Sequence, residues 1–182
     1  LSLSLSARLA FAGCCRAADH AWELLEGHGI HHKKGSQAVP EPRGGPAAGG
    51  KELIATIVEL IKELSAKHEI AGIGICVAAL ISADQGTIVG APNIANLSEL
   101  NFVAEIKKVF DLPVIAENDA NAAAWGEAAF GAGRGHDHLL IVTVGTGIGG
   151  GIVVNGNLYR GGFGTAAEIG HMRVVPEGHL CG

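Results

Sequence analysis

The chain has 182 residues, of which 48% are hydrophobic and 17% charged, so it can bury a core, which argues against disorder over its whole length. A formal net charge of −5, from 13 Lys and Arg against 18 Asp and Glu, argues against nucleic acid as the main partner. The four cysteines lack the spacing of a secreted disulfide framework, which favours a reduced cytoplasm, and no apolar stretch is long enough to predict a membrane span.

Residues 1–36 differ in composition from the rest, and we interpret them as an unassigned leader that is not native to the fold. Their apolar start resembles a signal peptide and FAGC faintly resembles a lipoprotein cleavage site, but no basic region precedes them. The chain opens with Leu1 and its single methionine is Met172. We therefore expect a chain that is incomplete at its N-terminus.

Helical and strand patterns alternate after a Pro- and Gly-rich connector at 38–50, which predicts the α/β class. Apolar spacing predicts helices over 51–68, 98–110 and 118–130. In the second helix Ser98 is the expected N-cap, with Leu100, Val103, Ile106 and Val109 facing inward. Strands are predicted over 70–82, 87–90, 113–116, 138–144, 151–154 and 158–160, and Asn155-Gly156 predicts a hairpin turn between the last two.

A glycine-rich run at 145–151 is the first candidate site. It satisfies the dinucleotide pattern G-x-G-x-x-G, but that site needs a helix directly afterwards, and here a strand pattern follows. A glycine-rich hairpin can still hold phosphate through converging backbone N–H groups. The predicted phosphate-binding residues are Gly145, Thr146, Gly147, Gly149 and Gly150. The alternative is a glycine-rich turn without a ligand.

Short polar residues after the predicted strand 113–116 form the second candidate site. Asn118 and Asp119 stand where a strand ends and a helix begins, which is where open α/β sheets bind ligands. A carboxylate there could accept a proton from a substrate hydroxyl. The alternative is that Asn118 or Asp119 is only a helix cap.

The third candidate site contains Glu168 and His171, with Cys181 ten residues after the histidine. His171 and Cys181 could supply two of four zinc ligands. The other two would have to come from elsewhere, because Cys14, Cys15 and Cys76 offer no convincing partner.

Four segments together resemble the ROK family of sugar kinases and related repressors, in the family's order and spacing. They are APNI (91–94), PVIAENDANAAAWGEAAFGAG (113–133), IVTVGTGIGGGIVVNG (141–156) and GTAAEIGHMRVVPEGHLCG (164–182). The resemblance extends closely over 71–182 and loosely back to 38. It is greatest to the glucokinases of Gram-positive bacteria.

This resemblance implies an actin-like ATPase fold, of the ribonuclease H-like type, with sugar and ATP between two α/β lobes. Residues 37–116 would form part of the N-terminal lobe. Residues 117–182 would start the second lobe, with the phosphate loop and a truncated zinc motif. The implied reaction is ATP-dependent phosphorylation of a hexose, most closely of glucose to glucose 6-phosphate. Mg²⁺ and a structural Zn²⁺ are the implied metals, and a cytoplasmic homodimer or homotetramer is implied for the full-length protein.

The resemblance also implies roles for individual residues. Asp119 matches the catalytic base that takes the proton of the sugar 6-hydroxyl. The residues that match sugar contacts are Asn93, Asn118, Glu168 and His171. His171 and Cys181 match the first two zinc ligands, and Thr146 would approach the γ-phosphate.

At both ends the chain departs from the family pattern. Residues 1–36 contain no Asp-x-Gly-x-Thr phosphate loop, and the zinc motif stops at Cys181-Gly182, so we expect a fragment whose own activity is in question. Ala79 also stands where relatives often have a glycine beside the sugar. Two alternatives remain open. One is a ROK-type sugar-responsive transcriptional repressor, although residues 1–50 lack a helix-turn-helix pattern and a basic recognition helix. The other is a non-catalytic sugar-binding remnant.

Overall fold

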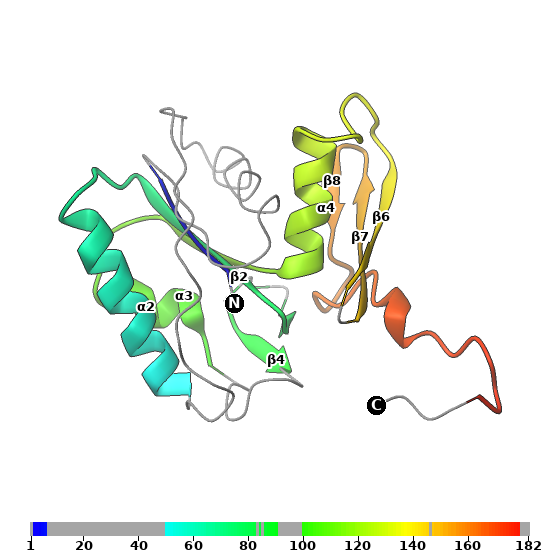
Figure 1. Ribbon diagram of the computed structural model, residues 1–182, viewed down its shortest axis with the longest axis horizontal. Helices are drawn as coiled ribbons and strands as arrows, with labels where there is room; N and C mark the ends of the chain where they lie inside the picture. The colour runs from blue at the N-terminus through cyan, green and yellow to red at the C-terminus, as the bar shows by residue number, and fades with distance from the viewer. Residues whose placement is uncertain are drawn as a thin grey trace.

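The computed structural model describes residues 2–6, 50–82, 84, 86–90, 100–145 and 147–178, and the structural statements below concern these residues. Helices and strands alternate along the chain, which confirms the predicted α/β class (Figure 1). No helix within these ranges is long and apolar enough to cross a membrane.

The first sheet has three strands in the order β1-β2-β5. Strands β2 (Gly72–Val77) and β5 (Val114–Asn118) run parallel, and β1 (Ser2–Ser6) pairs antiparallel with the other edge of β2. All six residues of β2 are buried, as a central strand covered on both faces requires. A segment of the expected leader 1–36 therefore forms an edge of this sheet, which its composition did not predict.

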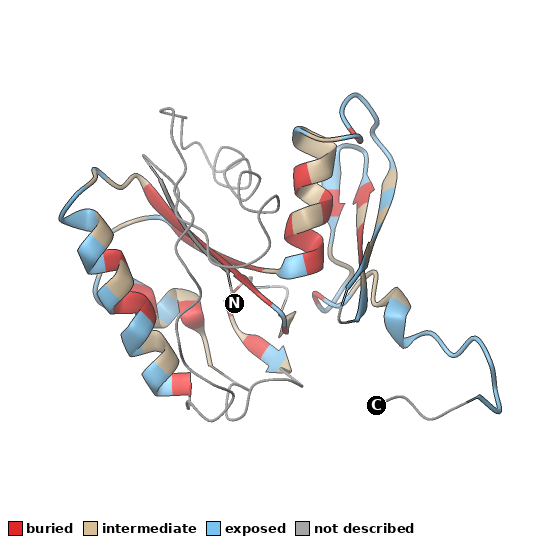
Figure 2. Cartoon of the chain, in the orientation of Figure 1, coloured by how far each residue is buried: buried red, intermediate tan, exposed pale blue. Residues whose placement is uncertain are grey.

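Helices α2 (Gly50–Ser65) and α3 (Phe102–Lys107) lie side by side and enclose the main core with this sheet (Figures 1 and 2). Ile57 and Ile61, about one helical turn apart on α2, are fully buried, as the apolar spacing predicts. Each such side chain contributes about 1.5–3 kcal/mol by leaving water. The core cluster consists of Ile57, Ile61, Ile73, Ile75, Val77, Ala79, Ile81, Ile88, Phe102, Ile106, Val114 and Ala116.

The predicted strand 70–82 is divided into two strands. The chain bends after Val77, where the N–H of Ala79 donates to the Val77 carbonyl oxygen at 2.8 Å. Strand β3 (Leu80–Ile81) then pairs antiparallel with β4 (Ile88–Gly90). The bend places Ala79 beside the end of β5, at the second candidate site.

Helix α3 is shorter than the predicted helix 98–110. Its N-cap is Asn101, whose side-chain oxygen accepts a hydrogen bond from the N–H of Ala104 at 2.7 Å, so the prediction of a cap at Ser98, a residue outside the described ranges, is wrong. Val109 was expected to face inward but is 50% exposed, because the helix ends at Lys107. Phe102, outside the predicted apolar face, is fully buried.

An antiparallel sheet of three strands in the order β6-β7-β8 occupies the right side of Figure 1. Its strands are β6 (Leu139–Val144), β7 (Ile148–Val154) and β8 (Asn157–Tyr159). Between β7 and β8, Asn155 and Gly156 have φ of 52° and 70°, which confirms the predicted tight turn. Helix α4 (Asp119–Ala129) packs along one face of this sheet, and its N-terminal end continues directly from β5.

The other face of the β6–β8 sheet is apolar and exposed (Figure 2). Side chains alternate along β6, so Leu140, Val142 and Val144 point away from α4 and are 60%, 49% and 80% exposed. Ile148, opposite Val144, and Tyr159 are also more than half exposed. Ala167 and Ile169 lie against this face at Gly150.

Candidate functional site

The polar run at 117–119 lies where β5 passes without a loop into α4. Asn118 is the N-cap of that helix: its Oδ1 accepts hydrogen bonds from the N–H groups of Ala120 at 2.9 Å and Asn121 at 3.0 Å. Its Nδ2 also donates to the carbonyl oxygen of Ala79 at 3.2 Å. Asn118 therefore caps α4, which is one of the two roles that the sequence allowed for it. One N–H of the Asn118 amide is left for a further partner.

Asp119, the predicted catalytic base, is the first residue of α4 and is exposed. Its Oδ1 accepts a hydrogen bond from the N–H of Ala120 at 2.9 Å, and Oδ2 has no hydrogen-bond partner among the described residues. A carboxylate in the first turn of a helix is stabilised by the helix dipole by about 0.3–1 kcal/mol. The structure thus holds one oxygen of Asp119 and leaves the other available for a further hydrogen bond.

Directly behind this junction Glu117 is buried, with both carboxylate oxygens occupied. Its Oε2 accepts a hydrogen bond from Arg160 Nε at 2.7 Å, and its Oε1 accepts from the Asn118 N–H at 3.0 Å and Asn121 Nδ2 at 3.2 Å. The side chains of Glu117 and Arg160 are only 6% and 21% exposed. Removing one partner of a buried ion pair costs about 3–5 kcal/mol, so the two residues depend on each other. Because Arg160 follows β8, the pair links the two sheets.

Cys76 lies opposite Glu117 in the register of β2 and β5. Burial, followed by the negative charges of Glu117 and Asp119, raises the pKa of its thiol from 9.0 to about 12. Only the thiolate is an effective nucleophile or metal ligand. Cys76 is therefore a structural residue near neutral pH.

The structure separates the glycines of the predicted phosphate loop into two groups. Strand β7 begins at Ile148, three residues earlier than predicted, so the turn between β6 and β7, which contains Gly145 and Gly147, is short. Gly145 and Gly147 lie in this turn, and a Cβ added at either would meet nothing within 4 Å. Such open backbone can approach a ligand.

Gly149, Gly150 and Gly151 instead lie inside β7 and make close contacts. A Cβ at Gly149 would lie 3.0 Å from the Cβ of Ala120, and one at Gly151 would overlap Ala124 on α4. On the opposite face a Cβ at Gly150 would lie 2.8 Å from the carbonyl oxygen of Ala167. Packing is therefore sufficient to explain these three glycines, and it brings β7 against the first turn of α4, beside Asp119.

Glu168 and His171 lie at the ends of one short turn. Glu168 precedes the 3₁₀-helix η1 (Ile169–His171), and its Oε2 is 3.6 Å from Nε2 of His171. A Cβ on Gly170 would overlap the carbonyl oxygen of Ile148, so this turn passes close to the start of β7. The turn lies at the same end of the β6–β8 sheet as the N-terminal end of α4 (Figure 1).

Three predicted site residues, Asn93, Thr146 and Cys181, lie outside the described residues. Within the described ranges no group of three or more His, Cys, Asp or Glu side chains is arranged to hold a metal ion. The described residues therefore supply no complete site for Mg²⁺ or Zn²⁺. The zinc ligands His171 and Cys181 stay a prediction.

Sequence reasoning did not identify Arg160 or the burial of Glu117. The two residues are 43 positions apart, and Arg160 follows a short strand without a recognisable motif. In the sequence Glu117 is only the first of three polar residues that follow an apolar strand pattern. A charged residue at the end of an otherwise apolar parallel strand was the available signal, because such a residue needs a partner of opposite charge.

A comparison with protein families and a comparison with individual proteins agree with each other. A sequence model for the ROK family matches residues 32–182. The glucokinase of Streptomyces coelicolor is 44% identical over 130 residues, covering 71% of this chain and 41% of that protein. The xylose repressor of Bacillus subtilis is 44% identical over 110 residues, covering 60% of this chain and 28% of the repressor.

A solved structure is similar as well. It is a ROK family glucokinase from Streptomyces griseus in complex with glucose and AMPPNP, with a TM-score of 0.66 and 43% identity over 73% of this chain and 42% of that chain. The chain thus spans about two fifths of the length of the glucokinases that it matches.

Proposed function

Because the chain belongs to the ROK family, we propose that it is part of a sugar kinase that transfers a phosphoryl group from ATP to a hexose, most specifically to glucose. The actin-like ATPase fold expected from the sequence agrees with its similarity to the ROK sugar kinases. The relative from Streptomyces griseus binds glucose and AMPPNP, which supports these substrates. The structural observation that best supports this proposal is the position of Asp119, which is exposed on the first turn of α4 beside the glycine-rich hairpin.

In the proposed reaction Asp119 accepts the proton of the sugar 6-hydroxyl. The hydroxyl oxygen then bonds to the γ-phosphorus while the bond from that phosphorus to the bridging oxygen breaks, and ADP leaves. Phosphoryl transfer depends mainly on positioning the reacting groups and on neutralising the charge of the phosphates. Mg²⁺ would contribute to that neutralisation when it is bound. A positioned general base contributes about 10²–10⁴-fold to the rate.

For the phosphates we propose the turn at 145–147. Its backbone at Gly145 and Gly147 is open, and Thr146 between them would add a hydroxyl donor. Gly149 and Gly150 would act indirectly, because their missing side chains let α4 and the segment before η1 approach β7. In this proposal the turn contacts the phosphates directly, and the glycines of β7 allow the packing that holds the turn in place.

For the sugar we propose Asn118, Glu168 and His171, together with Asn93. Asn118 has one free amide N–H by valence, and the Glu168 and His171 side chains are 37% and 76% exposed, so all three have polar groups available. A site that hydrogen-bonds several hydroxyls discriminates strongly between sugars. We further propose a cytoplasmic homodimer or homotetramer for the full-length protein, with His171 and Cys181 among the ligands of a structural zinc.

A sugar-responsive repressor is the second candidate, because a xylose repressor matches at the same 44% identity as a glucokinase. The two functions share the sugar side of the site and differ in phosphoryl transfer. A non-catalytic sugar-binding remnant would bind sugar but would neither transfer a phosphoryl group nor repress transcription.

Glucose-dependent release of ADP by the purified chain, compared with Asp119→Asn, tests the proposal. We expect Asp119→Asn to lower kcat by about 10²–10⁴-fold while glucose binding, measured by calorimetry, persists. The control is Asp111→Asn, which removes an exposed carboxylate at a loop away from the junction. Turnover unaffected by Asp119→Asn would refute the assigned base. Glucose binding without any turnover would instead support the remnant, and sugar-dependent retention on operator DNA would support the repressor.

A further inference from the structure

The Glu117–Arg160 ion pair connects two parts of the proposed site. On one side Glu117 stands two residues before Asp119 and accepts hydrogen bonds from the first turn of α4. On the other side the backbone carbonyl of Arg160 accepts a hydrogen bond from the N–H of Ala166 at 3.1 Å, two residues before Glu168. The side chain of Arg160 therefore contacts the segment that carries Asp119, through Glu117. Its backbone contacts the segment that carries Glu168 and His171.

We propose that Arg160 is a positioning residue: through Glu117 it holds the first turn of α4, and with it Asp119, in place relative to the turn that carries Glu168 and His171. This inference rests on the proposed function, and it names a residue that acts through others and touches no reacting atom.

The hydrogen bonds explain how a buried pair can set the position of an exposed carboxylate. Oε1 of Glu117 accepts from the backbone of Asn118, which caps α4, and from the side chain of Asn121, one turn along the helix. Arg160 Nε holds Oε2 at 2.7 Å, so the carboxylate cannot rotate without losing that contact. Asp119 lies between the two residues that Glu117 holds.

Removing Arg160 leaves Glu117 buried without its cation, and the carboxylate then has to move toward water. Both contacts to α4 would be lost in that movement. Removing both charges in Arg160→Met/Glu117→Gln leaves a neutral amide that can stay in place, because the penalty of an unpaired buried charge is gone. The double variant should therefore be less impaired than Arg160→Met alone.

Two readouts on the full chain test the inference. In steady-state kinetics we expect Arg160→Met to lower kcat on the order of 10- to 100-fold, as a misplaced catalytic group does, with little change in KM for glucose. Arg160→Lys should recover most of the loss. In carbon-13 NMR, Arg160→Met should shift the side-chain carboxyl resonance of Asp119, assigned by its loss in Asp119→Asn, and Arg160→Lys should restore it.

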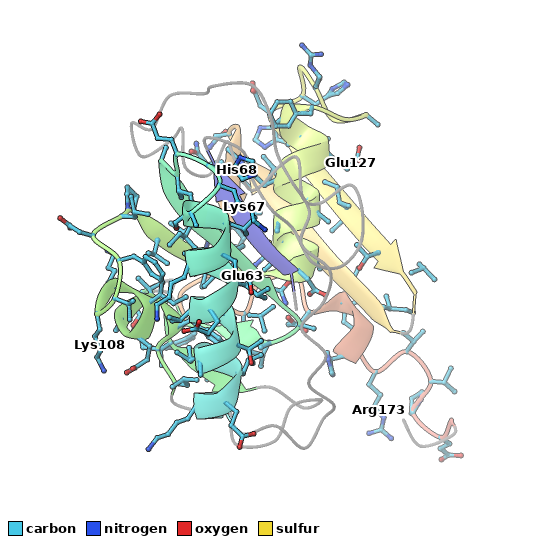
Figure 3. The ribbon with its side chains drawn as sticks, turned by 60° about the vertical axis from the view of Figure 1, so that its left-hand side comes forward. Glu63, Lys67, His68, Lys108, Glu127 and Arg173 are labelled. Atoms are coloured by element: carbon cyan, nitrogen blue, oxygen red, sulfur yellow. The ribbon has the colours of Figure 1, made fainter. Side chains whose placement is uncertain are left out.

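Lys108→Met is the matched control. It removes the cation of an exposed ion pair with Glu105, 2.6 Å long, on the side of the molecule away from the β6–β8 sheet (Figure 3). It should change neither readout.

The NMR readout needs no turnover, so the two proposals can fail separately. A wild-type chain without turnover counts against the proposed function, and the Asp119 resonance still decides the positioning role. A folded Arg160→Met with wild-type kcat, or with a wild-type Asp119 resonance, overturns the inference. If Arg160→Met does not fold, Arg160→Gln replaces it, because it removes the same charge and keeps a polar side chain beside Glu117: an altered Asp119 resonance supports the role, and an unaltered one overturns it.

Discussion

The side-chain amide of Asn118 donates a hydrogen bond to the carbonyl oxygen of Ala79 at 3.2 Å. The bond ties the end of β5 to the bend that follows β2. Because the same side chain also caps α4, it joins a strand, a bend and a helix at one point. A residue proposed to contact sugar is thus also a structural residue, and the two roles can be separated by substitution.

We expect Asn118→Ala to lower the free energy of unfolding by about 0.5–2 kcal/mol, because α4 loses its cap. Asn118→Asp keeps the capping oxygen but loses the Nδ2 donor to Ala79, so α4 stays capped while the bond to the bend is lost, and glucose should bind more weakly. Urea unfolding and calorimetry measure the two effects. Asn101→Ala, which removes the cap of α3, should cost stability without affecting glucose binding. Equal stability of Asn118→Ala and the wild type would contradict the capping role.

The two groups of glycines should respond differently to alanine. Gly151→Ala places a Cβ on top of Ala124, and we expect a loss of about 1–3 kcal/mol in the free energy of unfolding from overpacking. A Cβ on Gly147 would meet nothing within 4 Å, so Gly147→Ala should cost much less stability than Gly151→Ala. If the turn binds phosphate, Gly147→Ala should weaken AMPPNP binding. A Gly151→Ala chain of wild-type stability would show that α4 does not pack on β7 as described.

Stability should decline at alkaline pH through Cys76. Its pKa is raised from 9.0 to about 12 in the fold, so its stabilising contribution is present below pH 9 and is lost as pH rises from 9 toward 12. The loss at the top of that range is up to about 4 kcal/mol. Urea unfolding at several pH values measures it, and Cys76→Ala should show a shallower decline over the same range. Parallel declines in the two proteins would contradict this environment for Cys76.

Much of the fold follows from local patterns in the sequence. The apolar spacing of α2 predicts which residues it buries, since a helix that packs on a sheet must present one apolar face. Asn155 and Gly156 predict the turn between β7 and β8, since both adopt positive φ at little cost. The run at 117–119 likewise predicts polar side chains at a strand–helix junction, because its position after an apolar strand is a local property.

What the sequence determined by itself is therefore local: the α/β class, the helix faces, one tight turn and the candidate residues of the junction. The tertiary structure alone decided which distant residues meet there. It paired Glu117 with Arg160, placed Ala79 against Asn118, and assigned the glycines of β7 to packing and those of the turn to open backbone. These outcomes depend on how two sheets and α4 assemble, because burial makes a charge or a missing Cβ matter only once its neighbours are in place.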